Sequence, residues 1–267
     1  DNVAIGGDNN IGDINVGGGY GGGITSGSVT FLNLLAGEAG RDASLAMNGT
    51  SVRGNQAIGG ANNSAVAEVP TAHLPAGATG GGILVFQGTA DISKSMIANN
   101  HAQGGDGGIG AGGGVFFFGF VGTVDAKLSS SMVVHNTATG GDGADGLGGG
   151  IATGSLGSLV SLGSVLMNPE LTNVTVDVSR TLVVGNKVEG GVGGDGLGGG
   201  IYNGEDAEMS LERSMVFRNK ARGGPGGQGI GGGVFNLGDL NTIRSRIFAN
   251  WASDGDDNCS GCLQPRR

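Results

Sequence analysis

Hydrophobic and polar positions recur in a fixed order along this chain, and the order is typical of short strands. A Ser or Thr is followed two residues later by Val or Ile, and three residues after that by Asn. Short β-branched runs of this kind, bounded by Gly, predict β-strands, and no helical period is present. A second apolar run follows each GGG triplet, as at Ile83–Phe86 and Val115–Phe118, and predicts a further strand in each repeat.

The segment that leads from each Asn to the next apolar run is itself repeated. It reads NKVEGGVGGDGLGGGI at Asn186–Ile201, with the same spacing at Asn100–Val115, Asn136–Ile151 and Asn219–Val234. Equally spaced copies indicate a repeat architecture, here a β-solenoid in which each copy forms one coil. Counted from Asn2, the intervals between successive Asn residues are 53, 45, 36, 50, 33 and 31 residues, so we expect about six coils.

We expect residues 1–267 to form one β-solenoid domain with Gly-rich loops. Insertions at Ala65–Ala76 and Gly154–Thr172 explain two of the long intervals, because coil loops tolerate extra residues. The chain begins within a repeat, at its Asn, which predicts that preceding coils have been removed. Residues 251–267 are expected to form a C-terminal cap or tail, in which Cys259 and Cys262 close a local disulfide.

Stacked coils place equivalent residues in columns about 4.8 Å apart. An Asn column at a corner can hydrogen-bond amide to amide and satisfy the backbone of the turn, and a Ser or Thr column can do the same in the interior. This structural role accounts for the repeated polar residues, so we assign them no chemistry. The predicted Asn ladder comprises Asn55, Asn100, Asn136, Asn186, Asn219 and Asn250.

Composition and charge argue against a helical protein and against two kinds of binding partner. The 62 Gly among 267 residues argue against helices, because each interior Gly costs about 1 kcal/mol relative to Ala. A net charge of −9 and a pI of about 4.6 make nucleic acid and anionic membranes poor partners. No apolar run approaches the ~20 residues of a transmembrane helix, so we expect no membrane insertion by this segment.

The order [VI]-x-x-N followed by GGG-[IV] resembles the repeats of polymorphic outer-membrane proteins and related bacterial surface proteins. Gly198–Asn203, which reads GGGIYN, is the clearest instance, and the resemblance covers nearly the whole chain. It implies an all-β, right-handed parallel β-helix that is secreted or displayed at the cell surface, often as an adhesin. The arm between Asn and triplet is longer and richer in Gly than in those families.

Two arm segments, Gly140–Leu147 and Gly190–Leu197, match the calcium-binding pattern G-G-x-G-x-D-x-L. In β-rolls such turns hold Ca²⁺ between adjacent coils with Asp carboxylates and backbone carbonyls. Alternatively, these Asp and Gly residues are ordinary exposed turn formers. The candidate ligands form two columns, Asp106 with Asp142 (and Asp8 below them) and Asp145 with Asp195.

Two further columns carry side chains that could face a ligand. The Lys and Arg residues six positions before the Asn are interpreted as pointing outward with their charged groups in solvent, although they could face an acidic polysaccharide. Residues one past the Ile or Val of the triplet either point outward, offering rings for sugar stacking or self-association, or belong to the core. The first column contains Lys94, Arg180, Arg213 and Arg244; the second contains Thr25, Leu84, Phe116, Ala152, Tyr202 and Phe235.

The leading hypothesis is a non-enzymatic, extracellular or cell-surface β-helix with a structural or adhesive role, stabilised by calcium as its one expected cofactor. We expect it to associate end to end into fibres or layers, or to bind surface polysaccharide. No nucleophile motif or phosphate loop is present, and His73, His101 and His135 occupy unrelated repeat positions. The alternative is a polysaccharide-active enzyme of the lyase type, because such enzymes also use this fold and fold alone does not decide function.

Overall fold

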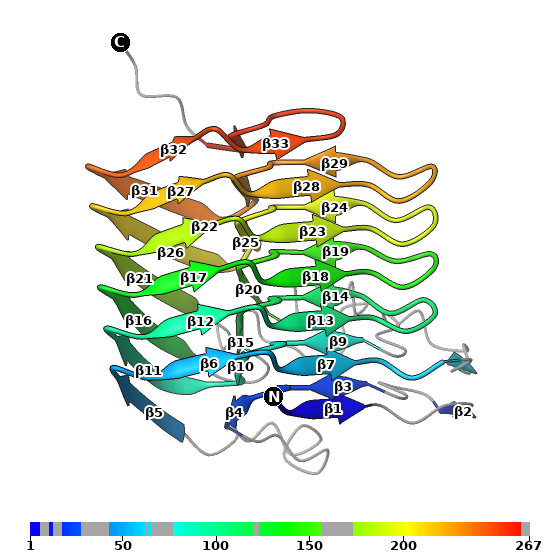
Figure 1. Ribbon diagram of the computed structural model, residues 1–267, viewed down its shortest axis with the longest axis horizontal. Helices are drawn as coiled ribbons and strands as arrows, with labels where there is room; N and C mark the ends of the chain where they lie inside the picture. Colours follow the sequence, from blue (N-terminus) through cyan, green and yellow to red (C-terminus); the bar gives the residue numbers. More distant parts are fainter. Residues whose placement is uncertain are drawn as a thin grey trace.

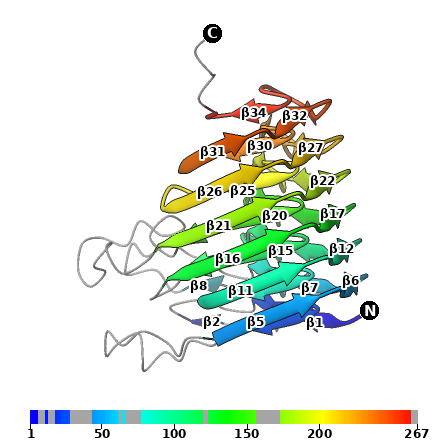
Figure 2. The ribbon, with the colours of Figure 1, turned by 90° about the vertical axis from the view of Figure 1, so that its left-hand side faces the viewer.

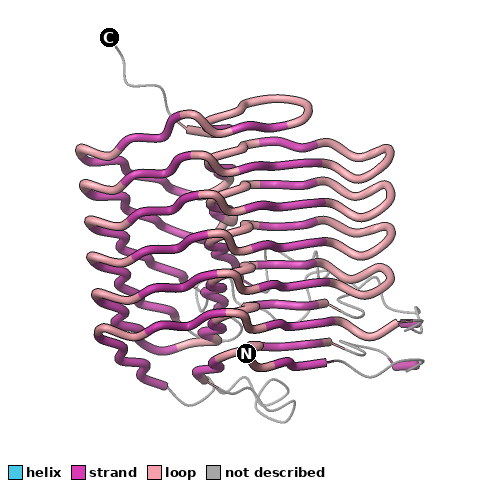
Figure 3. The backbone as a smooth tube through the Cα atoms, in the orientation of Figure 1, coloured by secondary structure: helices cyan, strands magenta, loops and turns pink. Residues whose placement is uncertain are grey.

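The structure is a computed structural model that describes residues 1–5, 11–12, 18–27, 43–61, 64–65, 77–119, 123–155 and 173–262. Within these residues every regular element is a strand (Figures 1 and 3). Asp8, His73, the end of the chain after residue 262 and most of both predicted insertions lie outside the described residues. The described part of the chain has no helix long and apolar enough to cross a membrane.

Strands of successive coils pair in parallel and stack into five large sheets (Figure 1). We number the sheets in the order in which one coil passes through them, starting after the Asn. Repeat positions stay in register, so that Val183 pairs with Val133 on one side and Val216 on the other. The predicted all-β fold with stacked parallel strands is therefore confirmed.

Sheets 1 and 2 form the Gly-rich arm and pack backbone to backbone. A Cβ atom added to Gly146 or Gly196 in sheet 2 would collide with a carbonyl oxygen of the next coil in sheet 1, so only Gly fits there. Sheet 1 comprises β1 (Val3–Ile5), β7 (Gln56–Ile58), β13 (His101–Gln103), β18 (Thr137–Thr139), β23 (Lys187–Glu189), β28 (Lys220–Arg222) and β33 (Trp251–Ala252). Sheet 2 comprises β3 (Gly19–Tyr20), β9 (Ala78–Thr79), β14 (Gly110–Ala111), β19 (Gly146–Leu147), β24 (Gly196–Leu197) and β29 (Gly229–Ile230); separately, β2 (Ile11–Gly12) pairs with β8 (Ser64–Ala65).

Sheets 3, 4 and 5 enclose the main hydrophobic core, and sheet 4 faces the viewer in Figure 2. Sheet 3 comprises β4 (Ile24–Ser26), β10 (Ile83–Val85), β15 (Val115–Gly119), β20 (Ile151–Ser155), β25 (Ile201–Asn203), β30 (Val234–Asn236) and β34 (Cys259–Ser260). Sheet 4 comprises β5 (Ala43–Asn48), β11 (Gly88–Ser93), β16 (Val124–Ser129), β21 (Val174–Ser179), β26 (Ala207–Glu212) and β31 (Asp239–Ile243). Sheet 5 comprises β6 (Ser51–Arg53), β12 (Met96–Ala98), β17 (Met132–Val134), β22 (Leu182–Val184), β27 (Met215–Phe217) and β32 (Arg246–Phe248).

Sheet 3 is buried on both faces, and its packing shows which way the residues one past the Ile or Val of each triplet point. Ile83 and Val115 point into the main core, whereas Leu84 and Phe116 point the other way into a second cluster against sheet 2. Leu84 is 0% and Phe116 2% exposed. Most rings of this column are therefore core rather than a surface for sugar stacking; Phe235, which is half-buried, and Thr25, which is exposed, stand near the two ends.

The cation column occupies a left-handed turn between sheets 4 and 5. Lys94, Arg180 and Arg213 each have φ of 48°, Arg244 has 53°, and Gly49 has 64° at the same repeat position. All four cationic side chains are exposed, in agreement with the solvated interpretation. Their positions are set by the turn, where a side chain other than Gly, Asn or Asp is strained.

Replacing Arg180 by Asn should therefore stabilise the fold by about 0.5–1 kcal/mol, because Asn tolerates the left-handed region better than Arg. Urea unfolding measures the change. The same substitution at Arg222 is the matched control, since this exposed residue lies in a regular strand outside the turn and should give no gain. An Arg180→Asn variant less stable than the parent would show that the Arg side chain makes a contact worth more than the strain.

Candidate functional site

The most extensively bonded polar feature is a ladder of Asn side chains where sheet 5 meets sheet 1. The backbone N–H and the Nδ2 of Asn136 both donate to Oδ1 of Asn186, at 2.9 and 3.0 Å. Asn186 donates in the same way to Asn219, and its Nδ2 also donates to the carbonyl oxygen of Val133 at 3.0 Å. The same pattern runs through Asn2, Asn55, Asn100, Asn136, Asn186, Asn219 and Asn250.

A second ladder of Ser and Thr hydroxyls runs along the corner between sheets 4 and 5. The backbone N–H of Ser95 donates to Oγ of Ser131 at 3.0 Å, and that of Thr181 donates to Oγ of Ser214 at 3.1 Å. Each hydroxyl in turn donates to a nearby backbone carbonyl oxygen; for Ser95 this is the carbonyl of Ser93, at 2.8 Å. Both corners thus satisfy buried backbone groups with side chains, as buried polar groups require.

The third Gly of each triplet lies directly against the Asn of the following coil. A Cβ atom on Gly200 would stand 2.7 Å from the carbonyl oxygen of Gly233 and 2.9 Å from Cγ of Asn219. Gly150 bears the same relation to Asn186, with a corresponding separation of 2.9 Å. The two most regular sequence features, the Asn and the triplet, are therefore one packing unit built from consecutive coils.

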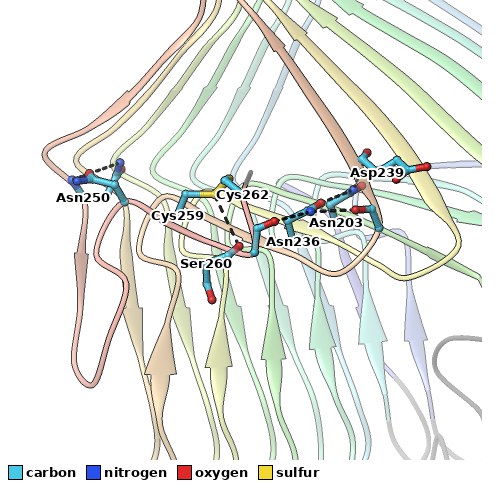
Figure 4. The surroundings of a disulfide bond; sticks show 10 residues. Asn203, Asn236, Asp239, Asn250, Cys259, Ser260 and Cys262 are labelled. Atoms are coloured by element: carbon cyan, nitrogen blue, oxygen red, sulfur yellow. Dashed lines mark hydrogen bonds between the residues drawn. A yellow bond between two sulfur atoms is a disulfide. The ribbon is translucent and has the colours of Figure 1, made fainter. Parts of the chain in front are cut away.

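The C-terminal segment supplies the last acceptors of the stack. Oδ1 of Asn258 accepts from the backbone N–H and the Nδ2 of Asn250, both at 3.2 Å, although Asn258 stands outside the repeat spacing. Asp257 accepts from the N–H of Ala252 at 2.8 Å. Beyond them Cys259 and Cys262 form a disulfide, beside which the side chains of Asn203 and Asn236 meet (Figure 4).

The four arm carboxylates predicted as calcium ligands behave differently from one another. Oδ1 of Asp145 accepts the backbone N–H of Asp195 at 2.7 Å, and Oδ1 of Asp195 accepts that of Gln228 at 2.7 Å. Both side chains are half-buried, and they follow each other from coil to coil. Asp106 and Asp142 lie exposed at the tip of the arm.

This arrangement fits a calcium ion poorly. Calcium takes six to eight oxygen ligands, whereas one oxygen each of Asp145 and Asp195 is already bonded to the backbone of the next coil. The carbonyl oxygens of Gly141 and Ala144 likewise accept hydrogen bonds from arm N–H groups. The described residues contain no group of three His, Cys, Asp or Glu side chains that could hold a metal. We derive no role through calcium, and its binding stays a prediction.

Asp145 should make stability depend on pH. Burial raises the pKa of Asp145 above its ordinary value of 3.8; the N–H of Asp195 opposes this rise and the charge of Asp195 adds to it. Because the folded pKa is the higher one, the ionised carboxylate destabilises the fold at neutral pH, and this cost disappears as the pH falls below 3.8. Asp145→Asn keeps an oxygen acceptor and should therefore raise the melting temperature at neutral pH but not in acid.

Thermal unfolding with calcium and with chelator, for the parent and for Asp145→Asn, tests whether this carboxylate binds calcium. Repeating it at several pH values tests whether its charge destabilises the fold. A stabilising effect of calcium that the substitution removes would support a metal site. A gain from Asp145→Asn that is the same at every pH would contradict the pKa argument.

The outer face of sheet 4 carries a second polar group of residues in a shallow depression of about 320 Å³. Lys127 stands in register between Asp91 and Asp177 of the neighbouring coils. Ser129 and Glu212 line the same depression. The amine of Lys127 and several carboxylates therefore share one hollow.

No family model matches this chain. No curated protein and no solved structure is significantly similar to it either. The site assignments therefore depend on the geometry of the chain itself.

Sequence reasoning did not find the terminating contacts of Asp257 and Asn258, or the short ladder from Thr153 through Asn203 to Asn236. Asn203 and Asn236 occupy the same position after the triplet, and this recurrence could have predicted the contact between their side chains. Asn258 follows Asn250 by eight residues, so no repeat spacing marks it.

Proposed function

We propose that this chain is a non-enzymatic, extracellular structural or adhesive solenoid, a right-handed parallel β-helix of about six coils. The resemblance of its repeats to polymorphic outer-membrane proteins supports a place at the cell surface. The single observation that carries the proposal is the use of the repeated polar side chains. The side chains of Asn186 and Ser214, like their equivalents, use their hydrogen bonds on backbone carbonyls and on the ladder side chain of the next coil. Ladder side chains used in this way support the stack of coils and are not free to take part in turnover.

Self-association is part of this proposal. In the described part of the chain, β5 and β6 each have a strand neighbour on one side only. An unpaired parallel edge pairs readily with another strand. Light scattering should show particle mass rising with concentration; a mass that stays monomeric over a wide range would remove this part of the proposal.

The alternative is a polysaccharide-active enzyme, and the observation that favours it is the depression on sheet 4. There Lys127 could act as a base beside Asp91 and Asp177, whose registers place them one coil to either side. Strand spacing of about 4.8 Å puts the two Asp backbones roughly 10 Å apart. A sugar chain could lie across the outer face of sheet 4, over these three side chains.

Incubation with acidic and neutral polysaccharides distinguishes the two functions. We expect no new reducing or unsaturated ends. Turnover that Lys127→Gln abolishes, and that Asp125→Asn on the same strand leaves intact, would establish the enzyme and overturn the structural role. Asp125 is a suitable control because it is exposed and outside the lining of the depression.

A further inference from the structure

The outer faces of sheets 5 and 1 lie side by side toward the viewer in Figure 1, and their chemistry changes along the stack. Near the middle these faces carry neutral side chains, among them Met132, Val134, Thr137 and Thr139. Toward the C-terminal end they become cationic and aromatic. We call this region the basic–aromatic patch, and it comprises Phe217, Arg218, Lys220, Arg222, Arg246, Phe248 and Trp251.

Rings and cations in this patch are arranged in contact with one another. The rings of Phe217 and Phe248 stack with centroids 5.4 Å apart and planes 7° from parallel. The guanidinium carbon of Arg246 lies 5.1 Å from the centroid of Phe248. Lys220 places its Nζ 4.5 Å from the centroid of Trp251, which is 45% exposed. Cation–π contacts hold the charged groups over the rings while leaving N–H groups free to bind.

These cations have no carboxylate partners among the described residues. The ion pairs found there join Lys187 to Glu189 and Arg213 to Glu212. Four of the 14 Lys and Arg residues lie in this patch, namely Arg218, Lys220, Arg222 and Arg246, in a chain whose net charge is −9. Glu189 lies next to Arg222 in the register of sheet 1, but it is ion-paired with Lys187. The patch therefore keeps a local excess of positive charge that can bind an anion at close range, because salt screens the more distant acidic groups beyond about 8–10 Å.

We propose that the basic–aromatic patch binds an acidic polysaccharide, a chain of sugar rings bearing carboxylate or sulfate groups. This deepens the adhesive function proposed above and rests on it. Arginine guanidinium groups match the planar geometry of these anions. Exposed Trp251 offers an apolar ring with a polar N–H, suited to the mixed apolar and hydroxyl surface of a sugar. The patch extends over both sheets and so fits an extended chain better than a single ion.

A nucleic acid fits the same surface less well. Tight binding to a nucleic acid depends on neutralising many phosphates along its backbone, and the cations here are confined to two adjacent coils of a strongly acidic protein. An anionic membrane fits less well for the same reason, and Trp251 is the one large aromatic of the patch that is well exposed.

Electrophoresis through gels containing dextran sulfate, polygalacturonate or neutral dextran tests this proposal. The protein should be retarded by at least one of the two acidic polymers and not by neutral dextran. The variant Lys220→Gln/Arg222→Gln/Arg246→Gln should bind roughly tenfold or more weakly. The matched control Arg53→Gln/Lys94→Gln/Arg180→Gln removes the same charge elsewhere and should bind as the parent does. Trp251→Ala should weaken binding without removing any charge.

Urea unfolding of all variants confirms that lost binding is not lost fold. Equal retardation of the parent and the patch variant would show that the patch is not the binding surface, while leaving the adhesive function intact. No binding by the parent to any acidic polymer would count against both. Tighter binding to a single-stranded oligonucleotide or to anionic phospholipid vesicles than to either polymer would assign the patch to a different partner and overturn the proposal.

Discussion

Replacing Asn186 by Leu is expected to lower the free energy of unfolding by about 3 kcal/mol, because buried donors lose their acceptor. Leu cannot accept the N–H and Nδ2 groups of Asn136, and it cannot donate to the carbonyl oxygen of Val133. Each of these groups is buried away from water, so each lost bond carries a desolvation cost. The larger branched side chain must also pack against Gly150.

The matched control is Asn241→Leu, at an exposed position on the outer face of sheet 4. It makes the same chemical change without touching the ladder and should leave stability nearly unchanged. Denaturant unfolding of the three proteins gives the comparison. If both variants lost the same amount of stability, the ladder would not be what holds this corner together.

Gly200→Ala is expected to destabilise by about 2–3 kcal/mol, the cost of inserting a methyl group into a filled space. The added Cβ would stand 2.7 Å from the carbonyl oxygen of Gly233, a backbone atom that cannot move alone. It would also press on the amide of Asn219, so the loss should be accompanied by a weakened ladder.

Gly255→Ala is the control for this substitution, because no atom lies within 4 Å of its added Cβ and its φ is not in the left-handed region. Its melting temperature should match that of the parent. A tolerated Gly200→Ala would mean that adjacent coils can separate at the triplet. The close approach inferred there would then be wrong.

The repeat pattern of the sequence was enough to predict stacked parallel strands. Positions such as Val133 and Val183 recur with the same neighbours, and in-register stacking is the arrangement that buries all of them in one core. The orientation of sheet 3 was not predictable. Ile83 and Leu84 are both apolar, and alternation cannot identify the inner face of a strand that is buried on both sides.

The candidate site shows a similar limit. Equal spacing placed Asp145 and Asp195 in one column, but it could not show that their oxygens are engaged by backbone N–H groups of the next coil. The exposure of the cation column was predicted, but the sequence did not show that its Arg and Lys residues share a left-handed turn. The basic–aromatic patch combines positions from two sheets and two coils, and only the fold brings Lys220 beside Trp251.

Hydrogen exchange of Asn side-chain amides, followed by nuclear magnetic resonance on Asn-labelled protein, tests the stacked-coil account most directly. The Nδ2 protons of buried ladder residues such as Asn136 and Asn186 should exchange with water far more slowly than those of exposed Asn241. In Asn186→Leu the protection of Asn136 should fall first. Side-chain amides that all exchange as fast as that of Asn241 would contradict the ladder, and with it the account of this chain as a rigid stack of coils.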